Sequence, residues 1–186
     1  MAYKGGANFV ISKGTDAPTM QFNKYIFFGK VEVVMKSSAG AGIVSSFILE
    51  SDDLDEIDWE WLGDKPTEVQ SNFFGKGDTT TYDRGATHTG LDNTLDTYLK
   101  YTIDWTSTSI QWKIGPADKG DDAQVLKRQL FATDPLAKAG TRYPQTPMKV
   151  KMGSWIACLD ANDVSKKGTC EWAGKTSFLF SEIQAN

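Results

Sequence analysis

The stretch DEIDWEW, residues 55–61, is the part of this chain that most constrains its fold. Acidic and large apolar residues alternate along it. Because successive side chains of an extended strand point to opposite faces, the pattern predicts a strand with one acidic and one apolar face. The acidic face would carry Glu56, Asp58 and Glu60, and the apolar face would carry Ile57, Trp59 and Trp61. We expect the apolar face to pack against a second sheet.

The three acids on one face are poorly explained by structure alone, since like charges in a row repel one another. Retaining glycosidases need a pair of carboxylates about 5–5.5 Å apart, one as nucleophile and one as acid/base. The Cα atoms of Glu56 and Glu60 would lie ~13 Å apart on a strand, so their long side chains and a concave sheet would have to bring the carboxyl groups together. Asp58 lies between them, in an auxiliary position. Crowding should raise at least one carboxyl pKa.

Length and composition set limits on the protein class. The 186 residues fit one domain, with 20 basic and 24 acidic residues and a net charge of −4. No basic patch of the kind that follows phosphates is present, so we expect no nucleic-acid partner. No apolar run is long enough to cross a membrane, and none follows Met1 as a secretion signal would require. We expect no cofactor and no metal, because His88 is the only histidine and there is no CxxC pair.

The two cysteines, Cys158 and Cys170, bracket a polar loop of eleven residues. A disulfide closing such a loop could stabilise the fold by roughly 3 kcal/mol in the chain-entropy model. It would indicate an oxidising compartment. Two reduced, unrelated thiols are the alternative, and we favour the disulfide.

Seven segments are predicted to be strands because they are rich in β-branched and aromatic residues and lie between turn residues: 25–35, 42–49, 55–61, 68–74, 98–105, 109–114 and 148–157. Short strands at this spacing indicate an all-β sandwich or barrel. The segment 118–136 carries one weak helical stripe between Gly120 and Pro135, formed by Ala123, Val125, Leu126, Leu130 and Phe131. We interpret it as an insertion with one short helix.

The turn signal at residues 63–66 predicts a hairpin that extends the acidic face onto the next strand. Gln70, Asn72 and Phe74 would then share that face. A plausible register places Gln70 near Glu60 and Asn72 near Asp58. Neutral amides beside carboxylates suit sugar hydroxyls, although an ordinary polar outer face is the plainer interpretation.

A second alternating pattern occupies residues 148–155. Lys149, Lys151, Gly153 and Trp155 would share one face. A cation, a gap without a side chain and an indole platform together are typical of a sugar subsite. The alternative is that Trp155 lies in the core and the lysines face solvent. Trp105, Trp112 and Trp172 are equally compatible with a core or a site.

The run DEIDWEWLG resembles the signature of glycoside hydrolase family 16 in its regular strand form, without the additional residue that makes a bulge. The wider sequence is similar to the fungal cell-wall chitin transglycosylases of the Crh group. This resemblance covers most of residues 7–174, and the motifs that carry it include VQSNFFGKGDTTTYDRG, YTIDWTSTSIQW, YPQTPMKVKMGSW and GTCEWAG.

The resemblance implies a β-jelly roll sandwich of two antiparallel sheets with a concave substrate cleft, and one catalytic domain over residues 1–186. It implies a secreted, cell-wall enzyme without a cofactor, monomeric, that cuts chitin and joins it to β-1,3-glucan or to another chitin chain. Glu56 would be the nucleophile, Asp58 the auxiliary acid and Glu60 the acid/base. Donor subsites would include Lys76, Tyr82 and Arg84, and further sugar contacts would come from Lys151, Trp155, Thr169 and Glu171.

Two other functions stay open at this point. A plain endo-hydrolase of β-glucan or chitin would use the same carboxylates with water as acceptor. A carbohydrate-binding jelly roll would have no need of both Glu56 and Glu60. Family members also carry about two strands before the position of Met1 and one more strand after the EWAG motif. We therefore expect a jelly roll that lacks terminal strands.

Overall fold

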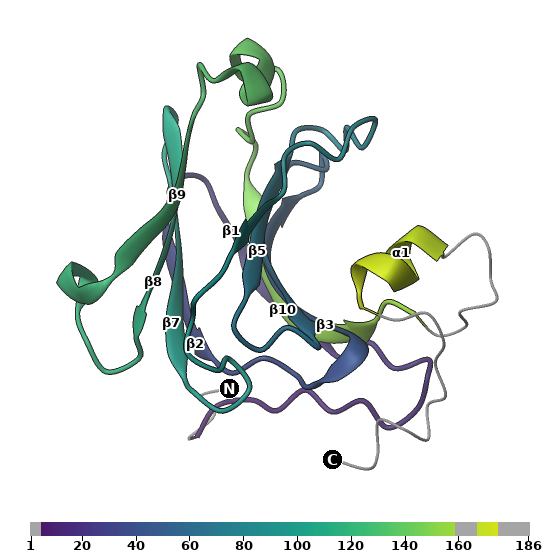
Figure 1. The fold of residues 1–186 in the computed structure, drawn as a ribbon. Coiled ribbons are helices and arrows are strands. Elements are labelled where there is room, and N and C mark those ends of the chain that lie inside the picture. The colour runs from purple at the N-terminus through teal and green to yellow at the C-terminus, as the bar shows by residue number, and fades with distance from the viewer. Residues whose placement is uncertain (1–4, 159–166, 175–186) are drawn as a thin grey trace.

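The computed structural model describes residues 5–158 and 167–174. The chain forms two antiparallel sheets, seen in Figure 1 as two facing layers. The first sheet has six strands, in the order β1 (Thr19–Ile26), β10 (Met148–Ile156), β3 (Gly40–Ser51), β4 (Glu56–Gly63), β5 (Val69–Phe74) and β6 (Ala86–His88). The second has four, in the order β2 (Gly29–Met35), β7 (Leu99–Trp105), β8 (Ser109–Pro116) and β9 (Val125–Phe131).

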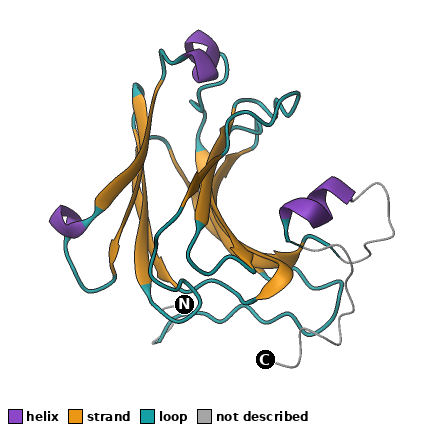
Figure 2. Ribbon diagram, in the orientation of Figure 1, coloured by secondary structure: helices purple, strands orange, loops and turns teal. Residues whose placement is uncertain are grey.

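Helices are short and lie at the periphery of the sandwich (Figure 2). In the described part of the chain they are the 3₁₀ helices Asp121–Ala123 and Pro135–Gly140 and the α-helix α1 (Lys167–Trp172). The six-stranded sheet curves away from the other sheet, and α1 lies on its concave side (Figure 1). The predicted all-β sandwich is confirmed. No helix among the described residues is long and apolar enough to span a membrane.

The core fills the space between the sheets. The apolar face of β4 contributes Ile57, Trp59 and Trp61, which are 0–1 % exposed. Indole N–H groups in this core donate across the sandwich, from Trp59 to the Thr102 carbonyl at 3.3 Å and from Trp112 to the Asp58 carbonyl at 3.0 Å. These hydrogen bonds satisfy buried donors and fix the position of β4 relative to the second sheet.

The single strand predicted over residues 25–35 is wrong. The chain forms two strands there, and β1 and β2 belong to different sheets. Phe28, with φ at 58°, and Gly29, with φ at 127°, turn the backbone between them. Phe27 and Phe28 lie between the two strands, and both of their rings contact Trp105. The ring centroids of Phe28 and Trp105 are 4.7 Å apart. Packing at the sheet edge therefore offsets the strain of a left-handed phenylalanine.

The interpretation of segment 118–136 is also wrong in part. A short 3₁₀ helix is present, but the predicted helical stripe lies on β9, which pairs with β8. Only Leu130 of the stripe enters the core, while Val125 and Phe131 stay 58 % and 48 % exposed. A bulge at the β8–β9 pairing disturbs the alternation that would have revealed the strand.

Candidate active site

The acidic residues of β4 project together from the concave face. In the paired strands, Glu56 stands opposite Phe74, Asp58 opposite Asn72 and Glu60 opposite Gln70. The predicted hairpin register is therefore confirmed. On the other side β3 pairs with β4, which brings Glu50 directly opposite Glu56. Asp58 is 1 % exposed, whereas its two neighbours in the row are partly exposed.

The three carboxyl groups have different proton affinities. Burial raises the pKa of Asp58 well above its ordinary value, and the negative charges of Glu60 and Glu56 raise it further. The hydrogen-bond interaction between Asp58 and Glu56 also raises the pKa of Asp58, so a proton shared by the pair favours Asp58. Burial and then the negative charge of Glu50 raise the pKa of Glu56, and the interaction with Asp58 offsets only part of that rise. Burial, assisted by the charge of Glu56, raises the pKa of Glu60 to about 7.

This arrangement separates the chemical roles of the three acids. Glu56 is the best candidate to be an ionised nucleophile, because a neighbouring acid stabilises its charge. Glu60 can carry a proton near neutral pH, which a general acid requires. Arg128, from β9, adds a cation that lowers the pKa of Asp58 and donates to the Ser71 carbonyl at 3.0 Å from the core side of the sheet. Nothing in the sequence pattern pointed to this arginine.

A cavity of about 600 Å³ opens beside Glu60. Its walls combine aromatic rings with amide and hydroxyl groups, namely Gln70, Asn72, Phe74, Tyr82, Gly85, Trp155, Gly168, Thr169 and Trp172. Aromatic faces and a few polar groups in a concave site are typical of ligand pockets. Five of the predicted substrate-binding residues thus share one cavity: Gln70, Asn72, Tyr82, Trp155 and Thr169.

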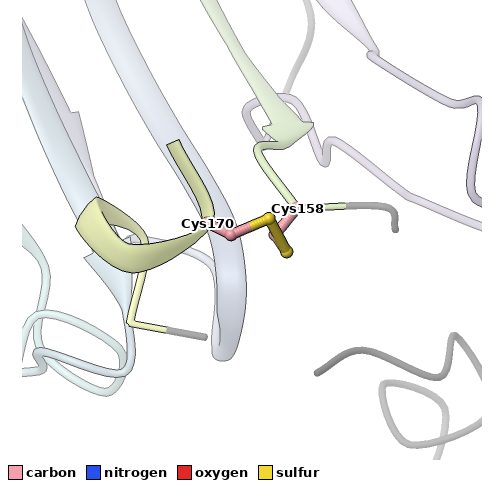
Figure 3. The surroundings of a disulfide bond; sticks show 2 residues. All are labelled: Cys158 and Cys170. Atoms are coloured by element: carbon pink, nitrogen blue, oxygen red, sulfur yellow. A yellow bond between two sulfur atoms is a disulfide. The ribbon is translucent and has the colours of Figure 1, made fainter. Parts of the chain in front are cut away.

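One cavity wall is built by β10 and α1. Trp155 and Trp172 lie with their rings stacked at 6.2 Å between centroids and an angle of 27°. The Trp172 indole donates to the Gln70 side chain at 2.9 Å, which links α1 to β5. Cys158 and Cys170 form a disulfide with their Cα atoms 4.6 Å apart, and it joins α1 to the end of β10 (Figure 3). The expected cysteine pair is present, and residues 159–166 between the two ends lie outside the described part.

The opposite side of the cavity is formed by the loop after β5. Tyr82 in this loop is 84 % exposed and lines the cavity. Asp78 anchors the loop through an ion pair with Arg142 at 2.7 Å. Gly75 is required where this loop begins, because a Cβ there would lie 2.5 Å from the Arg142 Cα. The start of the loop that carries Tyr82 is therefore held in place.

Four predicted sugar contacts do not line the cavity, namely Arg84, Lys76, Glu171 and Lys151. Arg84 is 1 % exposed, and its guanidinium donates to the carbonyls of Asp78 and Thr81 while lying 5.0 Å from the Phe74 ring centroid. It holds the loop from within rather than facing the cavity. Lys76 and Glu171 are exposed and outside the cavity lining.

The subsite pattern of residues 148–155 is only partly reproduced. Trp155 lines the cavity, but Lys151 forms an ion pair with Glu50. The gap at Gly153 is not free for a sugar, because a Cβ there would lie 2.4 Å from the Pro18 carbonyl oxygen. This glycine instead permits the close approach of the chain that enters β1. Among the described residues, no three metal-ligating side chains are gathered into a metal site.

A curved antiparallel sandwich with paired carboxylates on its concave sheet defines a glycoside hydrolase type of fold and site. The sequence pattern of glycosyl hydrolases family 16 matches residues 2–174, and the chain belongs to this family. Among curated proteins it is 53 % identical over 169 residues to Crh-like protein 5 of Aspergillus fumigatus, covering 91 % of this chain and 39 % of that protein. It is 43 % identical to Congo red hypersensitive protein 1 of Saccharomyces cerevisiae, covering 91 % and 30 %.

Solved structures agree with this assignment. The fold matches a Crh5 transglycosylase in complex with NAG at a TM-score of 0.80 and 49 % identity, covering 91 % of this chain and 64 % of the other. A Bacillus licheniformis β-glucanase matches at a TM-score of 0.65 and 26 % identity, covering 87 % and 64 %. The chain thus spans less than half the length of these curated relatives.

Proposed function

We propose that this domain is a retaining transglycosylase that cleaves chitin and transfers the new end to a β-1,3-glucan or chitin acceptor. The observation that carries the proposal is the row of three carboxyl groups on β4, of which Glu60 lines an aromatic-walled cavity. The names of the relatives, which include a transglycosylase complexed with NAG, favour the same chemistry. A binding module would gain nothing from acids that destabilise one another.

In the first step, Glu60 gives its proton to the glycosidic oxygen while a Glu56 carboxylate oxygen attacks the anomeric carbon. The bond from that carbon to the leaving oxygen breaks, and a glycosyl ester forms on Glu56. Asp58 keeps its proton and its hydrogen bond to Glu56, which orients the attacking oxygen. The leaving sugar departs as an alcohol, so charge and protons balance within the site.

In the second step, Glu60 is the base. It takes the proton of an acceptor hydroxyl, whose oxygen attacks the anomeric carbon and releases Glu56 as a carboxylate. Transfer exceeds hydrolysis only when an acceptor sugar is held in better position than water. The stacked pair Trp155 and Trp172 gives the cavity a flat aromatic wall suited to this purpose.

The remaining cavity residues are assigned to binding. Gln70 and Asn72 would hydrogen-bond sugar hydroxyls beside the acids, Tyr82 would stack on a sugar ring, and Thr169 would donate or accept a hydrogen bond. Polysaccharides are thus the proposed partners. The disulfide between β10 and α1 supports an extracellular or cell-wall location, since such bonds persist in oxidising compartments.

The test is to incubate the protein with chitin oligomers and a fluorescent laminarin oligomer, or a fluorescent chitin oligomer, and to separate the products by size. Labelled product longer than the acceptor supports transfer. Shortened chitin without labelled hybrid would replace transfer by hydrolysis. Unchanged chitin would remove the catalytic proposal and favour a binding module. Glu56→Gln is the matched control, since it removes one charge from the same face.

A further inference from the structure

A charged pair that the sequence pattern did not reveal adjoins the acidic row. Glu50 of β3 and Lys151 of β10 form an ion pair, and each side chain is 26 % exposed. The two residues are 101 positions apart in sequence and come together because β3 pairs with β10. Lys151 is the diagonal neighbour of Glu50, since its direct partner across the strands is Ile48.

The position of Glu50 creates an electrostatic problem for Glu56. The two residues are directly opposite on β3 and β4. Side chains at such positions have Cβ atoms about 4.5–5.5 Å apart, and like charges placed there repel. Two carboxylates at this distance relieve the repulsion when one takes a proton. If Glu56 took it, the site would lose its nucleophile.

We propose that the Glu50–Lys151 pair is a positioning device that keeps Glu56 ionised, with Lys151 neutralising Glu50. The inference rests on the proposed function, because it assigns the pair a task in a reaction that needs Glu56 as a carboxylate. Neither residue of the pair touches the reacting atoms in this account. Lys151 is thereby moved from the sugar-contact role expected from the sequence to an indirect one.

The other groups around Glu56 are acidic, uncharged or bound elsewhere, so we assign the neutralisation of Glu50 to Lys151. On β4 itself Asp58 supplies a hydrogen bond and Glu60 a further negative charge. On β5 the opposite residue is the uncharged Phe74, with Arg84 beyond it bound to loop carbonyls. The nearby Asp55 accepts hydrogen bonds from the backbone N–H groups of Lys76 and Gln145 and from the Thr146 hydroxyl.

The influences on the pKa of Glu56 agree with this geometry. After burial, the charge of Glu50 is the next influence that raises the pKa of Glu56, and the charge of Lys151 lowers it. Lys149 is on the same face of β10 and directly opposite Glu50, but its ammonium lies 3.8 Å from Asp52 and 4.6 Å from the Tyr25 ring centroid. It therefore offers a matched control.

The experiment compares five proteins: the unchanged chain, Lys151→Met, Glu50→Gln, the double variant and Lys149→Met. The first readout is a carboxyl NMR titration of ¹³C-labelled glutamates, with the Glu56 signal assigned by its loss in Glu56→Gln. The second is the pH profile of kcat/KM on chitin oligomers. Lys151→Arg is added as the conservative variant that should restore both readouts.

We expect Lys151→Met to move the Glu56 titration and the acid limb of the profile to higher pH. At a pH on that limb, kcat/KM expressed as a fraction of its own plateau should be about threefold to tenfold lower in Lys151→Met than in the unchanged chain. Glu50→Gln should move both readouts to lower pH, the double variant should lie near the unchanged protein, and Lys149→Met should leave both where they are.

An unchanged Glu56 titration in both Lys151→Met and Glu50→Gln would overturn the inference. Equal shifts of the Glu56 titration in Lys151→Met and Lys149→Met would also overturn it. Failure of the proposed function is distinguishable from this result. It would appear as absent turnover in the unchanged chain, while the NMR titration would still decide whether the pair controls Glu56.

Discussion

The two faces of β4 differ in what they contribute to the protein. The core face carries Ile57, Trp59 and Trp61, fully buried against the second sheet, with the Trp59 indole hydrogen-bonded across the sandwich. The concave face carries three acids whose pKa values are all raised, first by burial and then by the negative charge of neighbouring carboxyl groups, which for Glu56 is that of Glu50. One face stabilises the fold, and the other uses part of that stability to hold carboxyl groups in states that water would not favour.

We infer from the two faces of β4 that stability and reactivity can be changed separately on a single strand. A substitution on the core face should unfold the protein and lower activity only as a consequence. A substitution on the concave face should lower activity while leaving the fold intact or even more stable.

Glu56→Gln should have the largest effect. The amide cannot form the glycosyl ester, so turnover of chitin oligomers should fall by at least about a thousandfold. The free energy of unfolding should not decrease, because one of the mutually repelling charges is gone. Product chromatography and urea denaturation measure the two quantities on one preparation. Retained activity would remove Glu56 from the nucleophile role.

Trp59→Ala should break the other face. Loss of a buried indole leaves a cavity in the core, with an expected destabilisation of about 3–5 kcal/mol. Urea or guanidinium unfolding followed by tryptophan fluorescence measures it, with Glu60→Gln as the control from the concave face. A loss below about 1 kcal/mol would contradict the role given to the core face.

Glu60→Gln should produce a smaller effect that depends on the donor. General acid catalysis contributes about 10²–10⁴-fold, and this contribution should be lost on natural chitin oligomers. Aryl chitobiosides with good leaving groups need little protonation, so their first step should be nearly unaffected. Pre-steady-state release of the aryl group measures that step. An equal loss on both donors would argue against an acid role for Glu60.

The smallest effect is a dependence of stability on pH. Carboxyl groups whose pKa is raised on folding bind more protons in the folded state, so stability should fall as pH rises. For Glu60 the decline should extend from about 4.5 to about 7 and amount to roughly 1–3 kcal/mol. Glu60→Gln should flatten it. Urea midpoints between pH 5 and pH 8 measure the effect, and a rise in stability over this range would be inconsistent with the assigned proton affinities.

Local alternation was enough to predict the parts of the molecule that lie close together in sequence. The two faces of β4 and its register with Gln70 and Asn72 follow from period-two patterning and one tight turn. The same reasoning failed where tertiary packing overrides it. Phe28 accepts a positive φ because its ring packs on Trp105, and this splits one apolar run into two strands.

Contacts between distant segments could not be predicted from the sequence. Glu50 and Lys151 look like ordinary surface residues until β3 and β10 are paired. The Glu50–Lys151 pairing depends on sheet order, which neither composition nor local spacing contains. The Arg84 contacts are local by contrast: this residue was expected at a donor subsite, but its guanidinium binds the carbonyls of Asp78 and Thr81 in its own loop, and the residue types of that loop do not specify how it folds.

The most direct test of the account asks which atom receives the sugar. Glu60→Gln, incubated with an aryl chitobioside, should form the glycosyl ester quickly and resolve it slowly, so the ester should accumulate. Acid quenching, digestion and mass spectrometry with fragmentation would then locate the added sugar. We expect a chitobiosyl adduct on Glu56. Release of the aryl group with no adduct at any residue, or an adduct on another side chain, would contradict it.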